Sequence, residues 1–351
     1  MQAAVLTAFG GPEVLEVREV AEPRPGRGEV LVEVRAAAVN NTDLWTRQGA
    51  YGLPGRPDAP AGWRGPVTFP RIQGGDMAGV VREVGEGVDA AWRGRRVLVD
   101  PAFYDGPGDD ARPVGLLGSE ADGGFADAVV VGADRVHDMT DSPLDDEALA
   151  CLPVAFGTAT GMLERGAIGA GETVLVTGAS GGVGLAAVQL AAARGARVLA
   201  LTTPDQAAAV RDAGATATVD RHLGAEELAA AVAEVAPDGL DAVADVVGGP
   251  VLATVLPLVT DGGRWVIAGA MGGPVVEFDL RRLYLHNVAL VGSSMHTPAH
   301  FARLAADAVA GRVAPRIAAR YALADIHAAQ DDFARSAHVG KIVVLPGAAD
   351  R

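Results

Sequence analysis

The part of the chain with the clearest chemical character is a glycine-rich turn within VLVTGASGGVGLAAVQLAA. The turn consists of Ala179, Ser180, Gly181, Gly182, Val183 and Gly184. An apolar stretch precedes it and a helix-forming stretch follows it, so its backbone N–H groups would lie at a helix N-terminus. Such a turn holds the pyrophosphate of a dinucleotide, because glycines let the phosphates come close to the backbone. The motif predicts a dinucleotide site.

The same turn permits a second interpretation. Residues 178–182 also match the G-x-S-x-G pattern of a nucleophile elbow, in which Ser180 would attack an ester. His286, His296 and His300 lie at plausible distances after Asp245, where a hydrolase would need its general base. No oxyanion segment of the HGGG type precedes the turn, and an elbow does not need Gly184. A serine hydrolase using Ser180 is therefore the less favoured alternative.

The residues after the next apolar stretch, RVLAL (197–201), bear on the choice of nucleotide. Enzymes that use NAD usually place an acidic residue at this strand end, against the ribose 2′-hydroxyl. Here the strand ends in Thr202 and Thr203, whose hydroxyls could donate to a 2′-phosphate. Asp205 and the lack of a neighbouring Arg or Lys in the sequence count against a phosphate. NADPH is favoured over NADH.

Two kinds of secondary-structure pattern along the chain indicate what positions the nucleotide-binding residues. The first third alternates apolar and polar residues with period two at 14–20, 29–34 and 79–85, which predicts half-buried antiparallel strands. From about Asp145 apolar strands alternate with helical segments, which predicts crossover units and a parallel sheet. The strands are expected at 174–177, 197–201, 216–220, 241–247, 264–269 and 288–293, and the helices at 182–194, 205–213, 225–235 and 250–259.

After Pro298 the pattern returns to mixed structure. The layout therefore predicts an α/β domain inserted into a discontinuous α+β domain, with the active site in the cleft between them. Two stretches rich in Gly and Pro, 49–70 and 101–124, are expected to be long loops that shape the site.

Composition narrows the possible partners. The 351 residues suffice for two domains, and the net charge of −15 repels nucleic acid and anionic lipid. The chain has no run of eighteen apolar residues, the length needed to span a membrane, and its first residues do not resemble a signal peptide. The single cysteine, Cys151, fits a reducing compartment. These features predict a cytoplasmic protein that acts on a small molecule and binds neither nucleic acid nor membrane.

Four segments resemble the medium-chain dehydrogenase/reductase superfamily, in its zinc-free branch of quinone oxidoreductases. They are AAAVNNTDLWTRQGAY (36–51), FPRIQGGDMAGVVREVGEGV (69–88), residues 152–184 and GKIVVL (340–345). The resemblance spans the chain in the expected order. It implies a GroES-like α+β catalytic domain, residues 1–138 and 298–351, with an inserted Rossmann doubly wound parallel-sheet domain, residues 139–297. It also implies a homodimer or homotetramer.

The resemblance bears on metal content as well. Zinc-dependent relatives carry a cysteine where this chain has Asn40, a histidine where it has Gly75 and often a cysteine near Val154. Cys151 lies close to the last position, but one thiolate makes no zinc site. The resemblance therefore implies a zinc-independent enzyme.

Without a Lewis acid, conjugated carbonyls are easier substrates than simple ketones or alcohols. Hydride can add to the β-carbon, and the resulting enolate needs only hydrogen bonds. The resemblance thus implies 1,4-reduction of a quinone or an α,β-unsaturated carbonyl. The residues that it places at the substrate are Asn40, Asn41, Thr42, Trp45 and Tyr51. Tyr104, on the second long loop, is a further pocket candidate.

Among these residues Asn40 would donate to the substrate oxygen, and Thr42 would stand where relatives carry a proton-relay hydroxyl. Asn and Thr after a strand commonly cap a helix instead, and Tyr51 suits an aromatic wall as well as a proton donor. Near the cofactor the resemblance places Thr158 and Lys341, although a lysine at a strand end is often only solvated. Gly248, Gly269 and Ala270 join them, because they follow predicted strands at the ends where ligands bind.

Three other functions share these motifs in whole or in part. An enoyl-thioester reductase or a biosynthetic tailoring reductase would use the same fold and cofactor. A sensor would bind the nucleotide without catalysis. The serine hydrolase using Ser180 would not need a nucleotide.

Overall fold

The computed structural model describes residues 1–347, and it divides into two compact units. The first contains Met1–Val154 and the chain from Thr297 onward, and the second is Ala155–His296. Residues 139–154 thus belong to the first unit, whereas the sequence placed the division after residue 138. The reason is local packing within the first unit, where Ser142 Oγ donates to the Ala308 carbonyl at 2.8 Å. The end of the expected domain, residues 348–351, lies outside the described residues.

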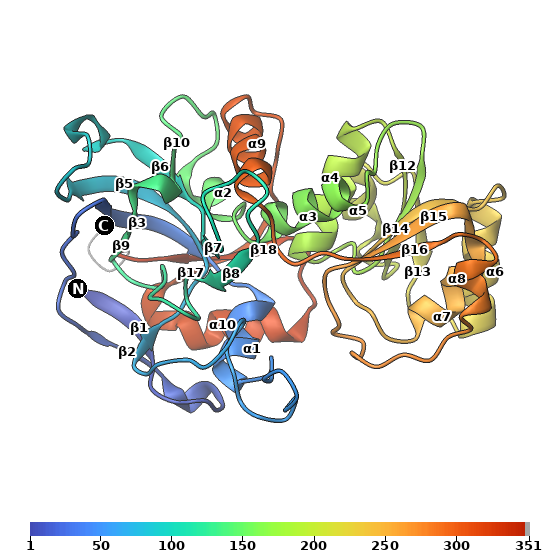
Figure 1. The fold of residues 1–351 in the computed structure, drawn as a ribbon, viewed down its shortest axis with the longest axis horizontal. Helices are drawn as coiled ribbons and strands as arrows, with labels where there is room; N and C mark the ends of the chain where they lie inside the picture. The colour runs from blue at the N-terminus through green and yellow to red at the C-terminus, as the bar shows by residue number, and fades with distance from the viewer. Residues whose placement is uncertain (348–351) are drawn as a thin grey trace. The chain divides into compact units, whose positions relative to one another are not determined.

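The first unit is built around a mixed sheet with β3 (Glu29–Ala38) near its centre (Figure 1). On one side lie β5 (Asp76–Val84), β6 (Arg96–Val99) and β10 (Val136–Asp138), and on the other β9 (Ala128–Gly132), β18 (Lys341–Leu345) and β17 (Ile317–Ala322). The pairing of β3 with β5 is antiparallel, as the period-two pattern predicted. Alternate β3 side chains, among them Val30 and Val32, enter the core.

Smaller elements complete this unit. A second sheet contains β1 (Gln2–Leu6), β2 (Leu15–Glu19) and β4 (Arg71–Ile72). The helices are α1 (Asn41–Gln48), α2 (Asp146–Ala150), α9 (Pro298–Val309) and α10 (Ile326–Arg335). Stretch 101–124 contains an antiparallel pair, β7 (Ala102–Tyr104) and β8 (Pro113–Leu116), so it is not the simple loop that was expected.

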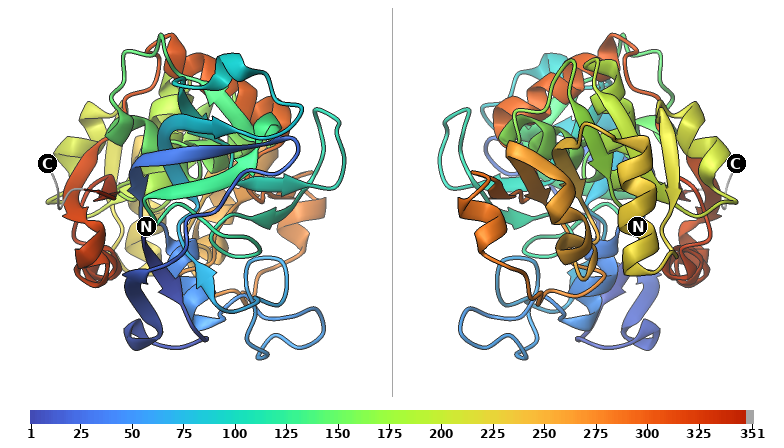
Figure 2. Two further views of the ribbon diagram at one scale, coloured as in Figure 1. Left: turned by 90° about the vertical axis from the view of Figure 1, so that its left-hand side faces the viewer. Right: turned by 90° about the vertical axis from the view of Figure 1, so that its right-hand side faces the viewer.

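The second unit is a parallel six-stranded sheet in the order β13-β12-β11-β14-β15-β16. Its strands are β11 (Thr173–Val176), β12 (Arg197–Thr202), β13 (Ala217–Asp220), β14 (Leu240–Asp245), β15 (Val259–Ile267) and β16 (Ala289–Gly292). The order reverses between β11 and β14, which is the doubly wound pattern with helices on both faces. The second view of Figure 2 shows this sheet and the helices that flank it.

The helices of the second unit are α3 (Ala155–Arg165), α4 (Gly182–Ala193), α5 (Ala207–Asp212), α6 (Ala225–Val235), α7 (Val251–Val255) and α8 (Arg281–Tyr284). Helix α6 has the predicted bounds. Strand β14 ends earlier than predicted, because Gly248 and Gly249 follow it with φ of 65° and 69° and turn the chain. The predicted helix 250–259 gives way to a 3-10 turn at Leu256–Leu258.

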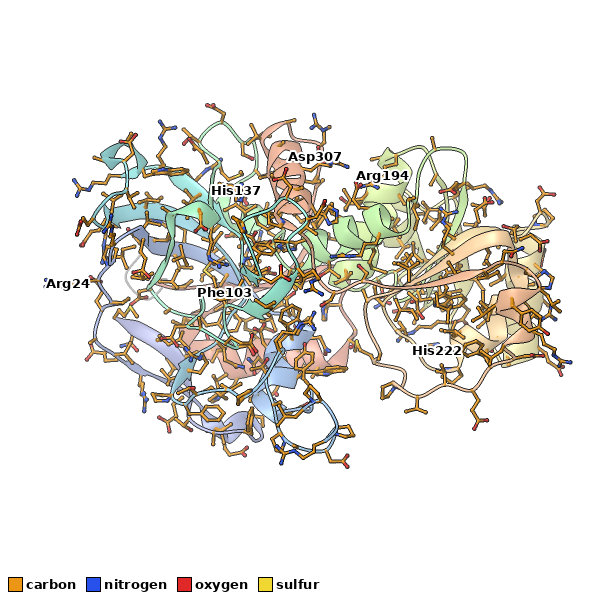
Figure 3. All side chains as sticks on the ribbon, in the orientation of Figure 1. Arg24, Phe103, His137, Arg194, His222 and Asp307 are labelled. Atoms are coloured by element: carbon orange, nitrogen blue, oxygen red, sulfur yellow. The ribbon has the colours of Figure 1, made fainter. Side chains whose placement is uncertain are left out.

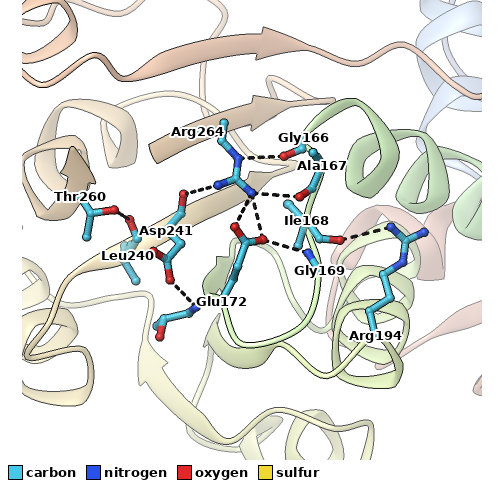
Figure 4. A network of polar contacts seen from close by, with 11 residues as sticks. Gly166, Ala167, Ile168, Gly169, Glu172, Arg194, Leu240, Asp241, Thr260 and Arg264 are labelled. Carbon is cyan, nitrogen blue, oxygen red and sulfur yellow. Dashed lines mark hydrogen bonds and ion pairs between the residues drawn. The ribbon is translucent and has the colours of Figure 1, made fainter. Parts of the chain in front are cut away.

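A polar network fixes the loop that leads into β11, at the end of the sheet where the strands begin (Figure 4). Arg264 of β15 donates to both carboxylate oxygens of Glu172, at 2.8 and 2.9 Å. The same guanidinium donates to the carbonyls of Gly166 and Ala167. Ala167 has a φ of 48°, which costs a residue with a Cβ some strain, and these bonds hold it there.

The described chain contains no long apolar helix: within residues 1–347, no helix has the length and apolar character needed to cross a bilayer.

Candidate functional site

The glycine-rich turn lies between the end of β11 and the start of α4. Gly178, just before it, has a φ of 56°, a backbone region that favours glycine. A Cβ at Gly184 would lie 2.1 Å from the carbonyl oxygen of Gly178. Helix α4 therefore comes closer to the strand than any other residue at position 184 would allow, as the dinucleotide spacing requires.

The N-terminus of α4 offers donors to an anion. Gly181 is its N-cap, and the helix's first bond runs from the Leu185 N–H to the Gly181 carbonyl at 2.8 Å. The N–H groups before Leu185 fall outside the helical ladder, at the positive end of the helix dipole. One turn thus brings together the predicted pyrophosphate residues Ala179, Ser180, Gly181, Gly182, Val183 and Gly184.

Ser180 does not have the surroundings of a nucleophile. Its side chain is buried, whereas an elbow exposes the serine above the sheet. Among the hydrogen bonds of residues 1–347, none joins Ser180 to a histidine. The geometry gives the hydrolase alternative no support.

Three further cofactor candidates lie at the same edge of the sheet. Gly248 follows β14, and Gly269 and Ala270 follow β15. The two turns pack closely, because a Cβ at Gly269 would lie 2.3 Å from the Val246 carbonyl oxygen. Ligands of open parallel sheets bind at this edge, beside the point where strand order reverses.

Thr158 lies buried in α3. Its hydroxyl contacts the Met295 sulfur at 3.6 Å, and Arg165 donates to the Met295 carbonyl at 2.9 Å. Met295 has a φ of 52°, an uncommon conformation for a residue with a long side chain. Thr158 therefore lies against a locally strained residue that Arg165 holds in place.

The end of β12 carries a feature that the sequence did not reveal. Thr202 is buried there, and within the described chain its hydroxyl has no hydrogen-bond partner. Strand β13 pairs with β12 in parallel, so the Arg221 N–H donates to the Thr202 carbonyl at 2.9 Å. A basic residue thus neighbours the predicted nucleotide site, although none is near in sequence. The register of two strands brings it there.

The charges around this strand end are mixed. The Thr203 hydroxyl and the positive charge of Arg221 lower the pKa of Asp205, and His222 acts in the same direction. His222 marks the segment after β13 in Figure 3. Asp205, which counted against a phosphate in the sequence, therefore has the basic residues Arg221 and His222 as neighbours, just after β13.

In the first unit, an ion pair lies buried beside the start of α1. Lys341 of β18 is 3% exposed and Asp76 of β5 is fully buried, and their charged atoms lie 2.9 Å apart. Lys341 Nζ also donates to the Val39 carbonyl at 2.8 Å and to Asn40 Oδ1 at 2.5 Å. These two hydrogen bonds and the ion pair engage the ammonium within the protein. Lys341 is thus neither solvated nor directed at a ligand.

Asn40 is equally engaged. Its Nδ2 donates to Asp76 Oδ2 at 2.8 Å and to the Ala38 carbonyl at 3.3 Å. A side-chain amide has only two N–H groups, so neither remains to donate to a substrate. The arrangement differs from the role that the resemblance implied for Asn40, and it assigns that residue to the support of α1.

Asp43 completes the support of this helix. Its carboxylate accepts the Asn40 N–H at 2.8 Å, three residues before it, as in a capping box. Burial raises the pKa of Asp43 to about 7, and nearby Asp76 adds to the effect. A titratable group with a pKa near neutrality therefore caps the helix that carries the substrate candidates.

The donor set does not fit zinc. The positions where relatives carry ligands are Asn40, whose oxygen accepts from Lys341, Gly75, which has no side chain, and Val154. The nearest carboxylate, Asp76, accepts from Asn40 and the Val154 N–H and forms an ion pair with Lys341. Across the described residues, no group of three or more His, Cys, Asp and Glu side chains is arranged to hold a metal ion. Burial raises the pKa of the Cys151 thiol to about 12, so it stays protonated.

A pair of hydroxyls lies on the partly exposed side of α1. Tyr51 Oη donates to Thr42 Oγ1 at 2.8 Å, and the Tyr51 ring packs edge-on against Trp45 with centroids 5.3 Å apart. Burial raises the pKa of Tyr51, so the phenol keeps its proton at neutral pH. Three of the predicted substrate residues therefore lie together, and Asn41 begins the same helix.

Tyr104 forms a hydrogen bond of its own. Its hydroxyl donates to Asp100 Oδ2 at 2.6 Å, and burial followed by the Asp100 charge raises its pKa. Two residues that the sequence did not single out join the two long segments instead. Glu120 Oε1 accepts the Arg64 N–H at 2.8 Å, and Ser119 Oγ accepts the Trp63 N–H at 3.0 Å. No local pattern predicts such side-chain-to-backbone bonds.

Comparison with known proteins agrees with this architecture. Residues 26–141 match the alcohol dehydrogenase GroES-like domain, and residues 182–310 match the zinc-binding dehydrogenase family. The acryloyl-coenzyme A reductase of Metallosphaera sedula is 31% identical over 98% of this chain and 99% of its own. The human quinone oxidoreductase is 28% identical, with 98% of each chain covered.

Solved structures show the same fold over the whole length. A Sinorhizobium meliloti 1021 protein designated an alcohol dehydrogenase superimposes with a TM-score of 0.94 at 44% identity, covering 99% of this chain and 96% of that one. A mycobacterial protein solved with NADPH has a TM-score of 0.80 at 30% identity, covering 99% and 100%. The chain belongs to the medium-chain dehydrogenase/reductase superfamily, in its quinone oxidoreductase-like branch, and is an NAD(P)H-dependent oxidoreductase.

Proposed function

We propose that this oxidoreductase uses NADPH to reduce a quinone or an α,β-unsaturated carbonyl by 1,4-addition, without a metal. The observation that carries the proposal is the saturated cluster of Asp76, Lys341 and Asn40. Its donors and acceptors bind one another, so the hydroxyl pair of Thr42 and Tyr51 is left to interact with a substrate oxygen. Although one matching family is described as zinc-binding, these residues do not fit that ion.

Hydroxyl donors suit a conjugated carbonyl better than a simple one. When bound, the dihydronicotinamide supplies a hydride to the β-carbon of the substrate. The negative charge that then develops on the oxygen is spread over the conjugated system, and hydrogen bonds suffice to stabilise it. A saturated ketone localises the same charge on one oxygen, where a Lewis acid would be needed.

The proton follows the direction of the observed hydrogen bond. Thr42 donates its hydroxyl proton to the substrate oxygen and takes one from Tyr51, whose hydroxyl already points at Thr42 Oγ1. Solvent then restores the proton of Tyr51, whose side chain is partly exposed. Trp45 holds the Tyr51 ring and forms part of the pocket wall, with Asn41 beside it.

For the cofactor, the turn from Ala179 to Gly184 fits the pyrophosphate, because the N–H groups of Gly182, Val183 and Gly184 lie in the first turn of α4 without an intrahelical acceptor. Thr202 and Arg221 would bind the 2′-phosphate of NADPH, with an unpartnered buried hydroxyl and a positive charge. The relative solved with NADPH supports this choice over NADH. Thr158, Gly248 and the Gly269–Ala270 turn would lie nearer the nicotinamide.

The proposal is tested by calorimetric titration of the purified protein with NADPH and with NADH, followed by turnover assays. The panel pairs a quinone and an enone with a saturated ketone of similar size, each with and without a zinc chelator. We expect NADPH oxidation with the conjugated substrates alone, unchanged by the chelator. Reduction of the saturated ketone, or loss of activity on chelation, would contradict the metal-free mechanism.

A second candidate is reduction of an enoyl thioester, favoured by the 31% identity to acryloyl-coenzyme A reductase. It shares the chemistry proposed above and differs in the group attached to the carbonyl. Adding acryloyl-coenzyme A to the panel separates the two, because a thioester reductase would show a far lower KM for it than for a free enone.

We also propose that two copies associate through the second unit. Strand β16 forms an edge of the six-stranded sheet, and Leu290 on it is partly exposed. Tyr284 and Leu285, which precede it, are 66% and 60% exposed. An unpaired edge beside exposed apolar side chains is a site where a second chain can pair, so a homodimer would cover this surface.

A further inference from the structure

The carboxylate of Asp245 is buried at the end of β14, at the sheet edge that carries the glycine-rich turn. The residue is fully inaccessible to solvent. Its Oδ1 accepts from Thr177 Oγ1 at 2.6 Å and from the Val247 and Gly248 N–H groups at 2.9 Å each. Its Oδ2 accepts from the Trp265 indole N–H at 3.0 Å.

No described Lys, Arg or His forms an ion pair with this carboxylate. A buried charge without a counter-charge is costly, and here four hydrogen bonds replace the lost solvation. An apolar side chain at this position would avoid the cost altogether. The carboxylate therefore has a role beyond filling the core.

The four donors come from three strand ends that surround the point where strand order reverses. Thr177 directly precedes Gly178, where the glycine-rich turn begins. Val247 and Gly248 form the turn after β14, and Trp265 belongs to β15. A Cβ at Gly178 would lie 2.9 Å from Val246 Cγ2, so the first two turns also touch each other.

We infer that Asp245 is a positioning residue for the nicotinamide cofactor: it holds the turn after β11 and the turn after β14 in the relative placement that the cofactor needs. Trp265 of β15 binds the same carboxylate through its indole N–H, so a signal from this N–H follows changes at Asp245. The inference rests on the proposed use of a nicotinamide nucleotide.

Asp245→Asn tests the inference with almost no change in volume. An amide has one acceptor oxygen, so its Nδ2 must face either the Trp265 N–H or the donors of the two turns. We expect the dissociation constant for NADPH, measured by calorimetry, to rise about tenfold or more, as for a lost hydrogen bond to a charged group. The KM for the enone should change little, because the substrate candidates belong to the first unit.

Asp241→Asn is the matched control. Asp241 lies at the other end of β14 and accepts the Thr173 N–H of β11 at 2.8 Å, so it joins the same two strands away from the turns. A purely structural role for Asp245 predicts that both variants lose stability and affinity alike. The positioning role predicts weaker NADPH binding in Asp245→Asn alone.

If Asp245→Asn fails to fold, a second variant and a spectroscopic measurement on the wild type still test the inference. Trp265→Phe removes one donor and keeps the carboxylate, so it should weaken NADPH binding by a smaller factor. In ¹H–¹⁵N spectra of the wild type, the Trp265 indole resonance should shift when NADPH is added. Unchanged NADPH affinity in the variants that fold, together with an unmoved indole resonance, overturns the inference while the proposed function stands. A wild-type protein that binds no nucleotide overturns both.

Discussion

The buried ion pair of Lys341 and Asp76 allows a quantitative test by a double-mutant cycle. In Lys341→Met, Asp76 keeps two hydrogen bonds, from Asn40 and from the Val154 N–H, but loses its counter-charge. Removing one partner of a buried pair costs about 3–5 kcal/mol. For a unit of this size, that corresponds to a drop in melting temperature of roughly 6–20 °C. Asp76→Asn should be destabilising too, because it leaves the ammonium unpaired.

The double variant Lys341→Met with Asp76→Asn removes both charges. Since replacing a whole buried pair is often neutral or stabilising, it should be more stable than Lys341→Met alone. Urea unfolding of the four proteins, followed by circular dichroism, gives the coupling energy of the pair. A loss below about 1 kcal/mol in Lys341→Met would refute the reasoning, since it falls far short of a broken buried pair. If the losses in unfolding free energy of the two single variants simply add in the double variant, the reasoning is refuted as well.

The other predictions concern the site, its pH dependence and its assembly. Thr42→Val should lower kcat by about 10²–10⁴-fold, as for loss of a proton donor, with the KM for NADPH unchanged; a change in KM alone would contradict the relay. Arg221→Ala should raise the KM for NADPH about tenfold and leave that for NADH unaltered in parallel steady-state assays. Because the pKa of Asp43 is raised from 3.8 to about 7, the folded state holds its proton more tightly than the unfolded state. The wild type should therefore lose stability relative to Asp43→Asn as pH rises from about 4 to 7, and urea midpoints that run parallel across this range would exclude the effect. Leu290→Lys should yield monomers in analytical ultracentrifugation, whereas Leu252→Ala, a core change in the same unit, should not.

Features that depend on local pattern were predictable from the sequence. The strand, turn and helix from residue 173 to 193 follow from apolar periodicity and glycine spacing, and the structure confirms them. The fold was predictable as well, because the four segments that resemble the superfamily occur in the expected order along the chain. The end of β14 was placed too late, since two consecutive glycines with positive φ turn the chain after an apolar run.

Features that depend on pairing between distant segments were not predictable. Arg221 reaches the predicted nucleotide site only through the register of β13 on β12. Lys341 and Asn40 are 301 positions apart, and no local signal indicates that they share a hydrogen bond. For this reason Asn40 was expected to face a substrate, whereas its amide is used within the protein.

The position of β18 inside the sheet, between β3 and the edge strand β17, has a consequence for biosynthesis. Strand β18 pairs with β3 on one side and with β17 on the other, so the sheet of the first unit is complete only when Lys341–Leu345 are available. The inserted unit is one continuous stretch, Ala155–His296, and all six of its strands emerge from the ribosome earlier. Since continuous domains can fold during translation, the nucleotide-binding unit should acquire its structure on the ribosome. Until Lys341 arrives, Asp76 and Asn40 remain without their partner, and the nascent first unit is the part of the chain that chaperones and proteases would encounter.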